Sequence, residues 1–224
     1  MNNTLPVNEV FESIQGEATY TGTQSVFIRL QGCQVGCAWC DTKHTWDVEI
    51  PEKVLMPSLM LAKTEDSPYF SQMAIPDIMA MLDEFEARHI VITGGEPCMY
   101  NLVNLTESII ASGRSCQVET SGTYPIQVSR RTWVTLSPKL DMAGGKEVLH
   151  INYKRADEIK YPVGKMADVE KLLDRVIPHL YESGTDVWLQ PLSQNKTATA
   201  LCVEQATKHN WRVSIQTHKF IGVR

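Results

Sequence analysis

Short runs of consecutive apolar residues recur along the chain, and polar or glycine-rich residues follow most of them. Runs of this kind are typical of strands that are buried on both faces of a sheet. They predict strands at residues 25–30, 89–93, 115–119, 133–136, 158–161, 186–190 and 212–216. Apolar residues at helical spacing predict helices between them, at residues 76–86, 101–112, 168–180 and 197–209, the third ended early by Pro178.

This alternation predicts an α/β fold with a mainly parallel sheet and right-handed crossovers. Six or seven strands are too few for a complete eight-stranded barrel, so we expect a partial, open (β/α) barrel of about six parallel strands. We expect one domain over residues 1–224. Within it, residues 31–46 form a cysteine-rich loop, and residues 48–73, with Pro51, Pro57 and Pro68, form a proline-rich insertion after that loop.

Composition narrows the class of protein. The chain has 26 acidic and 21 basic residues, 43% hydrophobic residues and a formal net charge of −5. These values exclude a disordered chain and a basic nucleic-acid coat protein. No apolar run is long enough to span a bilayer, and the first residues lack a basic and apolar leader. We therefore expect a cytoplasmic protein with neither a membrane nor a nucleic acid as direct partner.

Three of the six cysteines lie within eight residues and have the spacing Cys33-x3-Cys37-x2-Cys40. The other three, Cys98, Cys116 and Cys202, are scattered through apolar segments and are expected to be buried. Thiolates bind soft metals, and three of them leave one iron of a [4Fe–4S] cluster open to an external ligand. A structural zinc site with His44 as fourth ligand, or unligated thiols, would also fit this spacing.

The cysteine spacing, with Trp39 before the last cysteine, resembles the signature of the radical S-adenosylmethionine (SAM) enzymes. Gly94-Gly95-Glu96-Pro97 resembles the motif that holds the methionyl ammonium group in that superfamily. More narrowly, the order of motifs along nearly the whole chain resembles the 7-carboxy-7-deazaguanine synthase family. Those motifs begin at Gln15, Phe27, Trp39, Ile92, Glu119, Ser137, Glu158, Leu189 and Gln216.

The resemblance implies a [4Fe–4S] cluster, SAM and Mg²⁺ as cofactors. It implies conversion of 6-carboxy-5,6,7,8-tetrahydropterin to 7-carboxy-7-deazaguanine with loss of ammonia, a step towards queuosine. It further implies an external electron donor, flavodoxin-like or ferredoxin-like, and a homodimer. A glycyl-radical-enzyme activase and a zinc-stapled binding module are the competing hypotheses.

The resemblance also assigns site residues, none of them as a side-chain acid or base. Cys33, Cys37 and Cys40 would bind the cluster, and Thr42 the Mg²⁺. SAM would be held by Trp39, Cys40, Asp41, Gly95, Ser137, Pro138 and Lys139, with Gly94, Glu96, Glu119 and Ser121 as further candidates. The substrate would contact Ile14, Gln15, Gly16, Arg29 and Thr93, with His44, His218 and Lys219 close by.

Several of these residues have a structural alternative. Trp39 would fit a core aromatic, Thr42 a turn cap and Lys139 a surface cation. Arg29 lies in an apolar strand, where an unpaired charge is costly to bury. We therefore expect it to bind the substrate carboxylate, the alternative being a permanent salt bridge to an internal acid such as Glu17 or Glu119. Ala18 stands where the family often has glycine, which puts the local backbone geometry in question.

Overall fold

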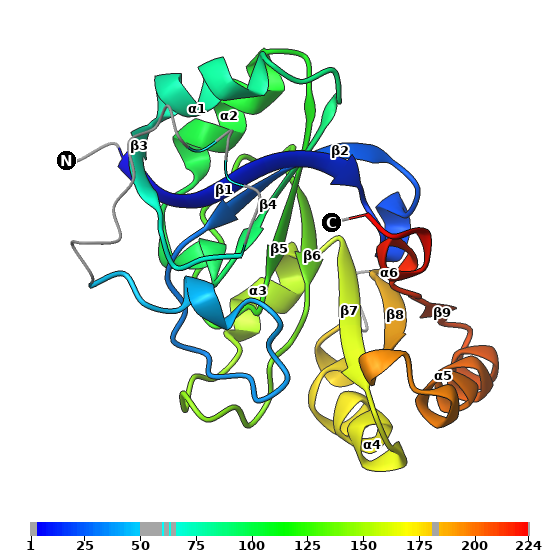
Figure 1. Ribbon diagram of the computed structural model, residues 1–224. Helices are drawn as coiled ribbons and strands as arrows, with labels where there is room; N and C mark the ends of the chain where they lie inside the picture. The colour runs from blue at the N-terminus through cyan, green and yellow to red at the C-terminus, as the bar shows by residue number, and fades with distance from the viewer. Residues whose placement is uncertain (1–3, 50–59, 61–62, 64–65, 181–183, 224) are drawn as a thin grey trace.

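A computed structural model describes residues 4–49, 60, 63, 66–180 and 184–223 (Figure 1). Nine strands form one sheet in the order β3-β1-β2-β4-β5-β6-β7-β8-β9. From β2 through β4 to β9 neighbouring strands are parallel, whereas β1 pairs antiparallel with both β2 and β3. The strands are β1 Thr4–Ile14, β2 Gln24–Leu30, β3 Ser71–Ala74, β4 His89–Gly94, β5 Ser115–Thr120, β6 Trp133–Leu136, β7 Glu158–Val163, β8 Asp186–Pro191 and β9 Arg212–Val213.

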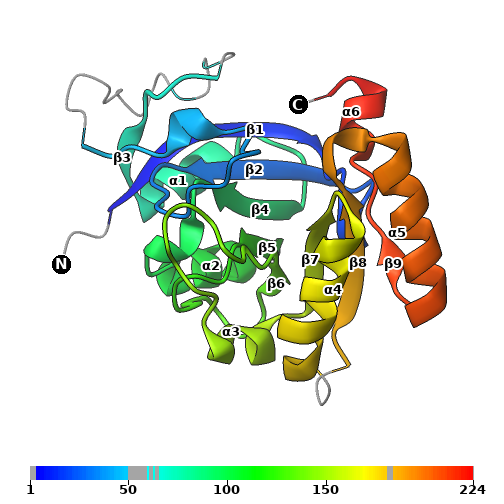
Figure 2. The same cartoon turned by 90° about the horizontal axis from the view of Figure 1, so that it is seen from below.

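The helices are α1 Ile75–Leu82, α2 Val103–Ala111, α3 His150–Arg155, α4 Met166–Arg175, α5 Lys196–His209 and α6 Thr217–Ile221. Helices α1 to α5 lie on the outer side of a curved sheet, and α6 lies at its open end (Figure 2). One apolar cluster packs α1 and α2 against strands β1 to β5. A second packs α4 and α5 against strands β6 to β8. Burial on both faces explains why β4 has Ile90, Val91 and Ile92 in succession, all fully buried.

The predicted open α/β barrel is confirmed, and all seven predicted strands are present. The expected number of about six parallel strands becomes seven, because the two-residue β9 adds a short edge beside β8. Two antiparallel strands, β1 and β3, were not predicted. Most of β3 lies inside the predicted insertion at 48–73, whose remainder falls largely outside the described residues.

The helix predictions are right in position and differ at the ends. Helix α1 ends at Leu82 rather than at residue 86, and α4 ends at Arg175, before a 3-10 turn that contains Pro178. The short helices α3 and α6 were not predicted. In the part of the chain that the structure describes, no helix is long and apolar enough to cross a membrane.

Candidate active site

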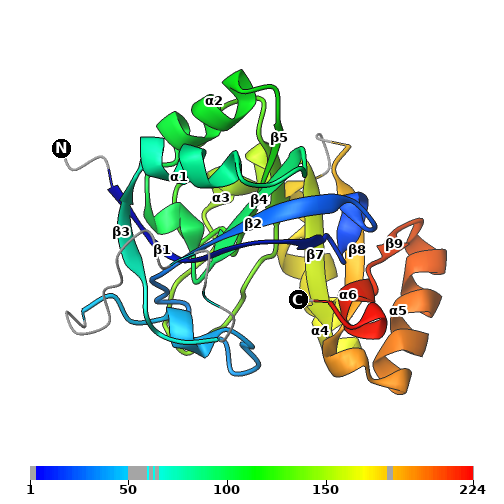
Figure 3. The same cartoon turned by 45° about the horizontal axis from the view of Figure 1, so that its top comes forward.

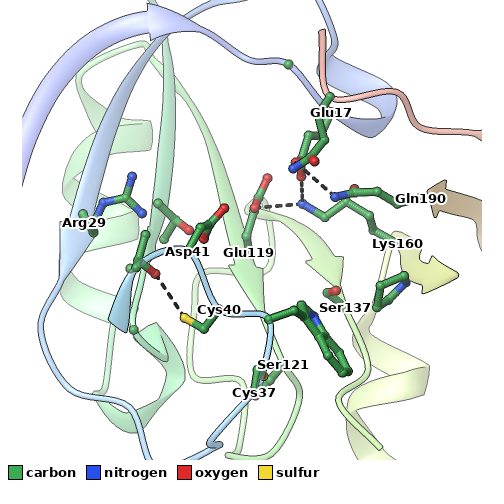
Figure 4. Close-up of a pocket in the computed structure, with 18 of the residues that line it drawn as sticks. Glu17, Arg29, Cys37, Cys40, Asp41, Glu119, Ser121, Ser137, Lys160 and Gln190 are labelled. Carbon is green, nitrogen blue, oxygen red and sulfur yellow. Dashed lines mark hydrogen bonds and ion pairs between the residues drawn. The ribbon is translucent and has the colours of Figure 1, made fainter. Parts of the chain in front are cut away.

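A cavity of about 520 Å³ lies on the inner side of the curved sheet (Figure 4). The loops after β2, β4, β5, β6 and β8 contribute to its wall, as expected for parallel strands whose carboxyl ends meet at one edge. Every site residue assigned by resemblance lines this cavity except Pro138 and His44. Pro138 is buried between its two lining neighbours, Ser137 and Lys139.

The cysteine-rich loop is fixed at its start by the chain that follows it. The backbone N–H of Gly32 donates to Thr45 (2.6 Å) and that of Cys33 to Trp46 (3.0 Å). Gly36 has a φ of +74°, and an added Cβ there would lie 2.8 Å from the backbone nitrogen of Gly144. The loop therefore needs glycine at that position to turn its thiols into the cavity.

The chemistry of this loop fits a cluster better than a zinc ion. Burial raises the pKa of Cys33 to about 11 and also raises the pKa of Cys37, so both thiols stay protonated unless a cation binds them. Among the described residues, no three His, Cys, Asp or Glu side chains are grouped to hold one metal ion. A tetrahedral zinc site needs such a grouping, whereas a cube binds its cysteines at separate iron corners. His44, the proposed fourth zinc ligand, is not in the cavity wall.

The Gly94-Gly95-Glu96 turn packs its backbone against the start of that loop. Gly95 donates to Leu30 (3.0 Å) and Glu96 to Gly32 (2.7 Å), and a Cβ on Gly95 would lie 2.2 Å from the Gly32 oxygen. The buried Glu96 carboxylate accepts from Cys98 N, Thr120 Oγ1, Ser121 N and Ser121 Oγ. These four donors occupy the acceptor sites of the carboxylate, so the Glu96 side chain links the end of β4 to the end of β5. Contacts with a cofactor would then come from the backbone of the two glycines.

Three of the structural alternatives are not supported. Trp39 is 45% exposed, which is too open for a core aromatic. The Thr42 side chain does not cap the following turn; its hydroxyl lies 3.6 Å from Cys40 Sγ in the cavity wall. Lys139 is no surface cation: burial lowers its pKa, and its Nζ donates to the Ser137 carbonyl (3.1 Å) and hydroxyl.

Arg29 lines the cavity from β2, next to Thr93 of β4. It is not unpaired: its Nε donates to Glu9, the residue directly across the β1–β2 pair. The alternative of a salt bridge to an internal acid is therefore present, but the acid is Glu9 rather than Glu17 or Glu119, because Glu9 lies on the unpredicted strand β1. The Glu9 side chain is 2% exposed and that of Arg29 is 18% exposed, so the guanidinium is the part of the pair that reaches the cavity.

Sequence reasoning missed a charged cluster on the opposite wall, formed by Glu17, Glu119 and Lys160 (Figure 4). Lys160 Nζ donates to Glu119 (3.0 Å) and to Glu17, and Gln15 Nε2 donates to Glu119 (3.0 Å). Burial alone would raise the pKa of Glu17, but Lys160 and a hydrogen bond from Gln216 lower it to about 2. A lysine inside the apolar run of β7 was the available signal, as it was for Arg29 on β2.

The loop between β1 and β2 closes this wall of the cavity. Figures 1 and 3 show β1 running towards the end of the sheet where α6 lies. Gly16 accepts a hydrogen bond from Thr217 N (3.0 Å), and its Cα packs on His218, where an added Cβ would lie 2.1 Å from the ring. His218 and Lys219 line the cavity as a result.

Comparison with known proteins agrees with this geometry. The Radical SAM superfamily model matches residues 27–175. The chain is 47% identical to 7-carboxy-7-deazaguanine synthase of Escherichia coli K12 over 220 residues, which cover 97% of this chain and 98% of that protein. It is 42% identical to the synthase of Buchnera aphidicola subsp. Schizaphis graminum, covering 98% and 99%. The crystal structure of QueE from Escherichia coli superposes with a TM-score of 0.92 at 46% identity, covering 95% and 94%.

Proposed function

The chain belongs to the 7-carboxy-7-deazaguanine synthase family of the radical SAM superfamily, and from this we propose that its cavity contracts 6-carboxy-5,6,7,8-tetrahydropterin to 7-carboxy-7-deazaguanine with loss of ammonia. One observation carries the proposal. The thiols of Cys33, Cys37 and Cys40 enter the same cavity as Arg29 and Gln15, so the cofactor residues face the substrate residues across one space. An activase acting on a partner protein, or a zinc module, would not require that arrangement.

The enzyme uses a [4Fe–4S] cluster, SAM and Mg²⁺. When bound, the reduced cluster and SAM would supply the 5′-deoxyadenosyl radical that starts the rearrangement. We assign the cluster to the three thiols of the 33–40 loop, which leaves one iron corner open to SAM. Because Gly95 has no side chain, its backbone packs directly against Gly32 and Cys33, and we assign it to SAM at the same end of the cavity. The further SAM contacts are Trp39, Cys40, Asp41, Ser137, Lys139 and the backbone of Pro138.

On the substrate side, Arg29 presents a planar fork to the carboxylate of the tetrahydropterin, and Glu9 fixes the orientation of that fork. The Gln15 side chain and the backbone of Gly16 face the flat pterin ring, together with Ile14 and Thr93. Thr42 would supply one oxygen ligand to Mg²⁺, an ion that also needs oxygen ligands from substrate and water. None of these residues acts as an acid or base in this scheme.

Electron supply and assembly are part of the proposal. A flavodoxin-like or ferredoxin-like protein of low potential would deliver the electron to the cluster in the cytoplasm, and two copies of the chain would form a homodimer. Light scattering of the anaerobically purified protein tests the dimer. Replacing chemical reductant with each class of donor, and measuring 5′-deoxyadenosine, tests the donor.

The reaction itself is tested by anaerobic incubation of the iron-loaded protein with SAM, reductant, Mg²⁺ and the carboxytetrahydropterin. Mass analysis should detect 7-carboxy-7-deazaguanine, and leaving out Mg²⁺ should lower its yield. Cys37→Ala protein is the matched control and should give no product. Formation of 5′-deoxyadenosine without any deazaguanine acid would show that this is a radical SAM enzyme with a different substrate.

A further inference from the structure

A row of polar side chains crosses the inner face of the sheet from β4 to β7, outside the cavity wall. Its members are His89, Gln117, Thr135 and Glu158, which are 3%, 0%, 0% and 0% exposed. Each comes from a different neighbouring strand. Burying four polar groups among apolar strands is costly unless all are hydrogen-bonded, so the row calls for a reason beyond packing.

The hydrogen bonds of the row run in one direction. Gln117 Nε2 donates to Thr135 Oγ1 (2.8 Å), and that hydroxyl donates to Glu158 Oε1 (2.6 Å). The Gln117 oxygen lies 2.9 Å from His89 Nε2 and can only accept, so the proton must be on Nε2. Burial lowers the pKa of His89, which keeps its ring neutral, and its Nδ1 lies 2.8 Å from Ser115 Oγ.

Both ends of the row hold the same short segment. At one end, Glu158 Oε2 accepts from the Thr19 hydroxyl (2.6 Å) and the Thr19 N–H (3.2 Å). At the other end, the Tyr20 ring stacks on His89 with ring centres 4.0 Å apart. Thr19 and Tyr20 belong to the 3-10 turn Ala18–Tyr20, which begins immediately after Glu17. Glu158 forms no ion pair among the described residues, so the three hydroxyl and amide donors alone satisfy it.

The turn is also strained, which means that something must hold it. Ala18 has a φ of +54°, a left-handed conformation that disfavours alanine. Its N–H donates to Ser214 Oγ (2.9 Å) at the far end of the chain.

We propose that this buried row is a positioning device for the substrate: it fixes the Ala18–Tyr20 turn from both ends and thereby places Gln15, Gly16 and Glu17 in the cavity wall. The inference rests on the proposed function for its kinetic readout. Thr19 and Glu158 are positioning residues in this scheme, since neither lines the cavity. If the row served only to stabilise the fold, apolar residues of similar shape would fill the same space at a lower desolvation cost. Stability alone would also not require that both ends of the row contact the same turn.

The decisive variant is Thr19→Val, which keeps the shape of the side chain and removes one donor to Glu158. The KM for the carboxytetrahydropterin should rise on the order of tenfold, the scale of a lost hydrogen bond to a charged group. Cluster content and uncoupled cleavage of SAM should stay at wild-type values. Thr19→Ser restores the hydroxyl and should restore the KM. Glu158→Gln, which places an amide donor against Thr135 or Thr19, should act in the same direction.

Thr106→Val is the matched control. The Thr106 hydroxyl on α2 is buried, donates to Leu102 O (2.8 Å) and lies outside the cavity wall. Both Thr106→Val and Thr19→Val should lower the melting temperature. Only Thr19→Val should raise the KM. Equal losses of melting temperature with an unchanged KM in both variants would overturn the proposal.

Hydrogen exchange gives a readout that does not depend on turnover. The amide of Ala18 should exchange faster in Thr19→Val than in wild type or Thr106→Val, because the turn is then held at Glu158 only by the Thr19 N–H. Unchanged exchange at Ala18 would also overturn the proposal. If the wild-type enzyme makes no deazaguanine acid, the proposed function fails, while the exchange experiment still decides whether the row holds the turn.

Discussion

At the scale of single residues, the six cysteines divide by what surrounds them. Cys33, Cys37 and Cys40 line the cavity, whereas Cys98, Cys116 and Cys202 are at most 3% exposed within the apolar core. Replacing any one of the first three with Ala should abolish bound iron and formation of 5′-deoxyadenosine, because two thiols cannot hold the cluster. Replacing any of the last three should cost only packing energy. Iron analysis of the purified variants measures the effect. A normal iron content in Cys37→Ala would contradict the assignment of Cys37 as a cluster ligand.

Arg29 gives the second prediction at this scale. Lysine keeps the positive charge beside Glu9 but loses the planar fork, so Arg29→Lys isolates the contact with substrate. We expect the KM for the carboxytetrahydropterin to rise on the order of ten- to a hundredfold. Thermal stability and uncoupled SAM cleavage should change little. A large loss of melting temperature with an unaltered KM would make Arg29 structural, with the carboxylate held by Mg²⁺.

Charged residues inside apolar strands were readable from the sequence, but their partners were not. Arg29 could be singled out because a lone charge in a buried strand needs a partner. Its pairing with Glu9 follows from the β1–β2 register, which no local pattern reveals. The same holds for Lys160, whose partners Glu17 and Glu119 are 143 and 41 residues away in the chain.

At the scale of elements, the parallel strands were predictable and the antiparallel ones were not. Strands such as β4 are apolar at consecutive positions because helices and core cover both faces. Strand β1 is buried at six consecutive positions, yet two of these are Asn8 and Glu9. The Asn8 side chain donates to Gln31 Oε1 (2.7 Å), so a hydrogen bond to a residue distant in the chain allows this polar side chain to be buried in the strand. Its sequence pattern therefore resembles that of a loop.

The contact between Gly16 and α6 yields a prediction about two elements. In Gly16→Ala the new Cβ would lie 2.1 Å from the His218 ring and 2.8 Å from its backbone nitrogen, so α6 must move away. Overpacking of this kind costs about 1–3 kcal/mol, and the KM for substrate should rise because Gly16 and His218 both line the cavity. Thermal unfolding and steady-state kinetics measure the two effects.

A control and a rescue separate this contact from a general effect of alanine. In Gly164→Ala the new methyl group would lie 3.2 Å from the flexible end of the Leu192 side chain and at an ordinary contact distance of 3.5 Å from Asp168 Oδ2, so stability should change little. Adding His218→Ala to Gly16→Ala removes the ring but leaves the backbone nitrogen, and should recover part of the lost stability. Full stability in Gly16→Ala alone would mean that α6 does not pack on this glycine in solution.

At the scale of the whole molecule, the open barrel is held together across its gap by polar contacts. The sheet starts with β3 and ends with β9, and no strand pairing joins these two ends among the described residues. The loop after β1 bridges the gap instead: Glu17 reaches Lys160 of β7, Gln190 of β8 and Gln216 before α6. Closure therefore depends in part on one buried carboxylate, beside the backbone and hydroxyl contacts of Gly16, Ala18 and Thr19.

This dependence predicts how stability changes with pH. The pKa of Glu17 is lowered from an ordinary value of 4.5 to about 2, because Lys160 and Gln216 outweigh the effect of burial. Because the pKa is lower in the folded state, the ionised Glu17 carboxylate contributes its full stabilisation of the fold above pH 4.5. That contribution is lost as the pH falls towards 2 and the carboxylate is protonated. The linkage amounts to about 3 kcal/mol in all, of which about 2 kcal/mol is lost between pH 7 and pH 3.

The test is the free energy of unfolding in urea, measured at both pH values for wild type and for Glu17→Gln. The difference between the two proteins cancels the other carboxylates and any acid loss of the cluster, and it should shrink by about 2 kcal/mol on acidification. Asp141→Asn is the control: Lys171 and Arg175 also lower the pKa of Asp141, but all three side chains are more than 40% exposed. Solvent screens that pair, so this variant should change the pH dependence far less. Equal effects from Glu17→Gln and Asp141→Asn would mean that solvent reaches Glu17 and that other contacts close the barrel.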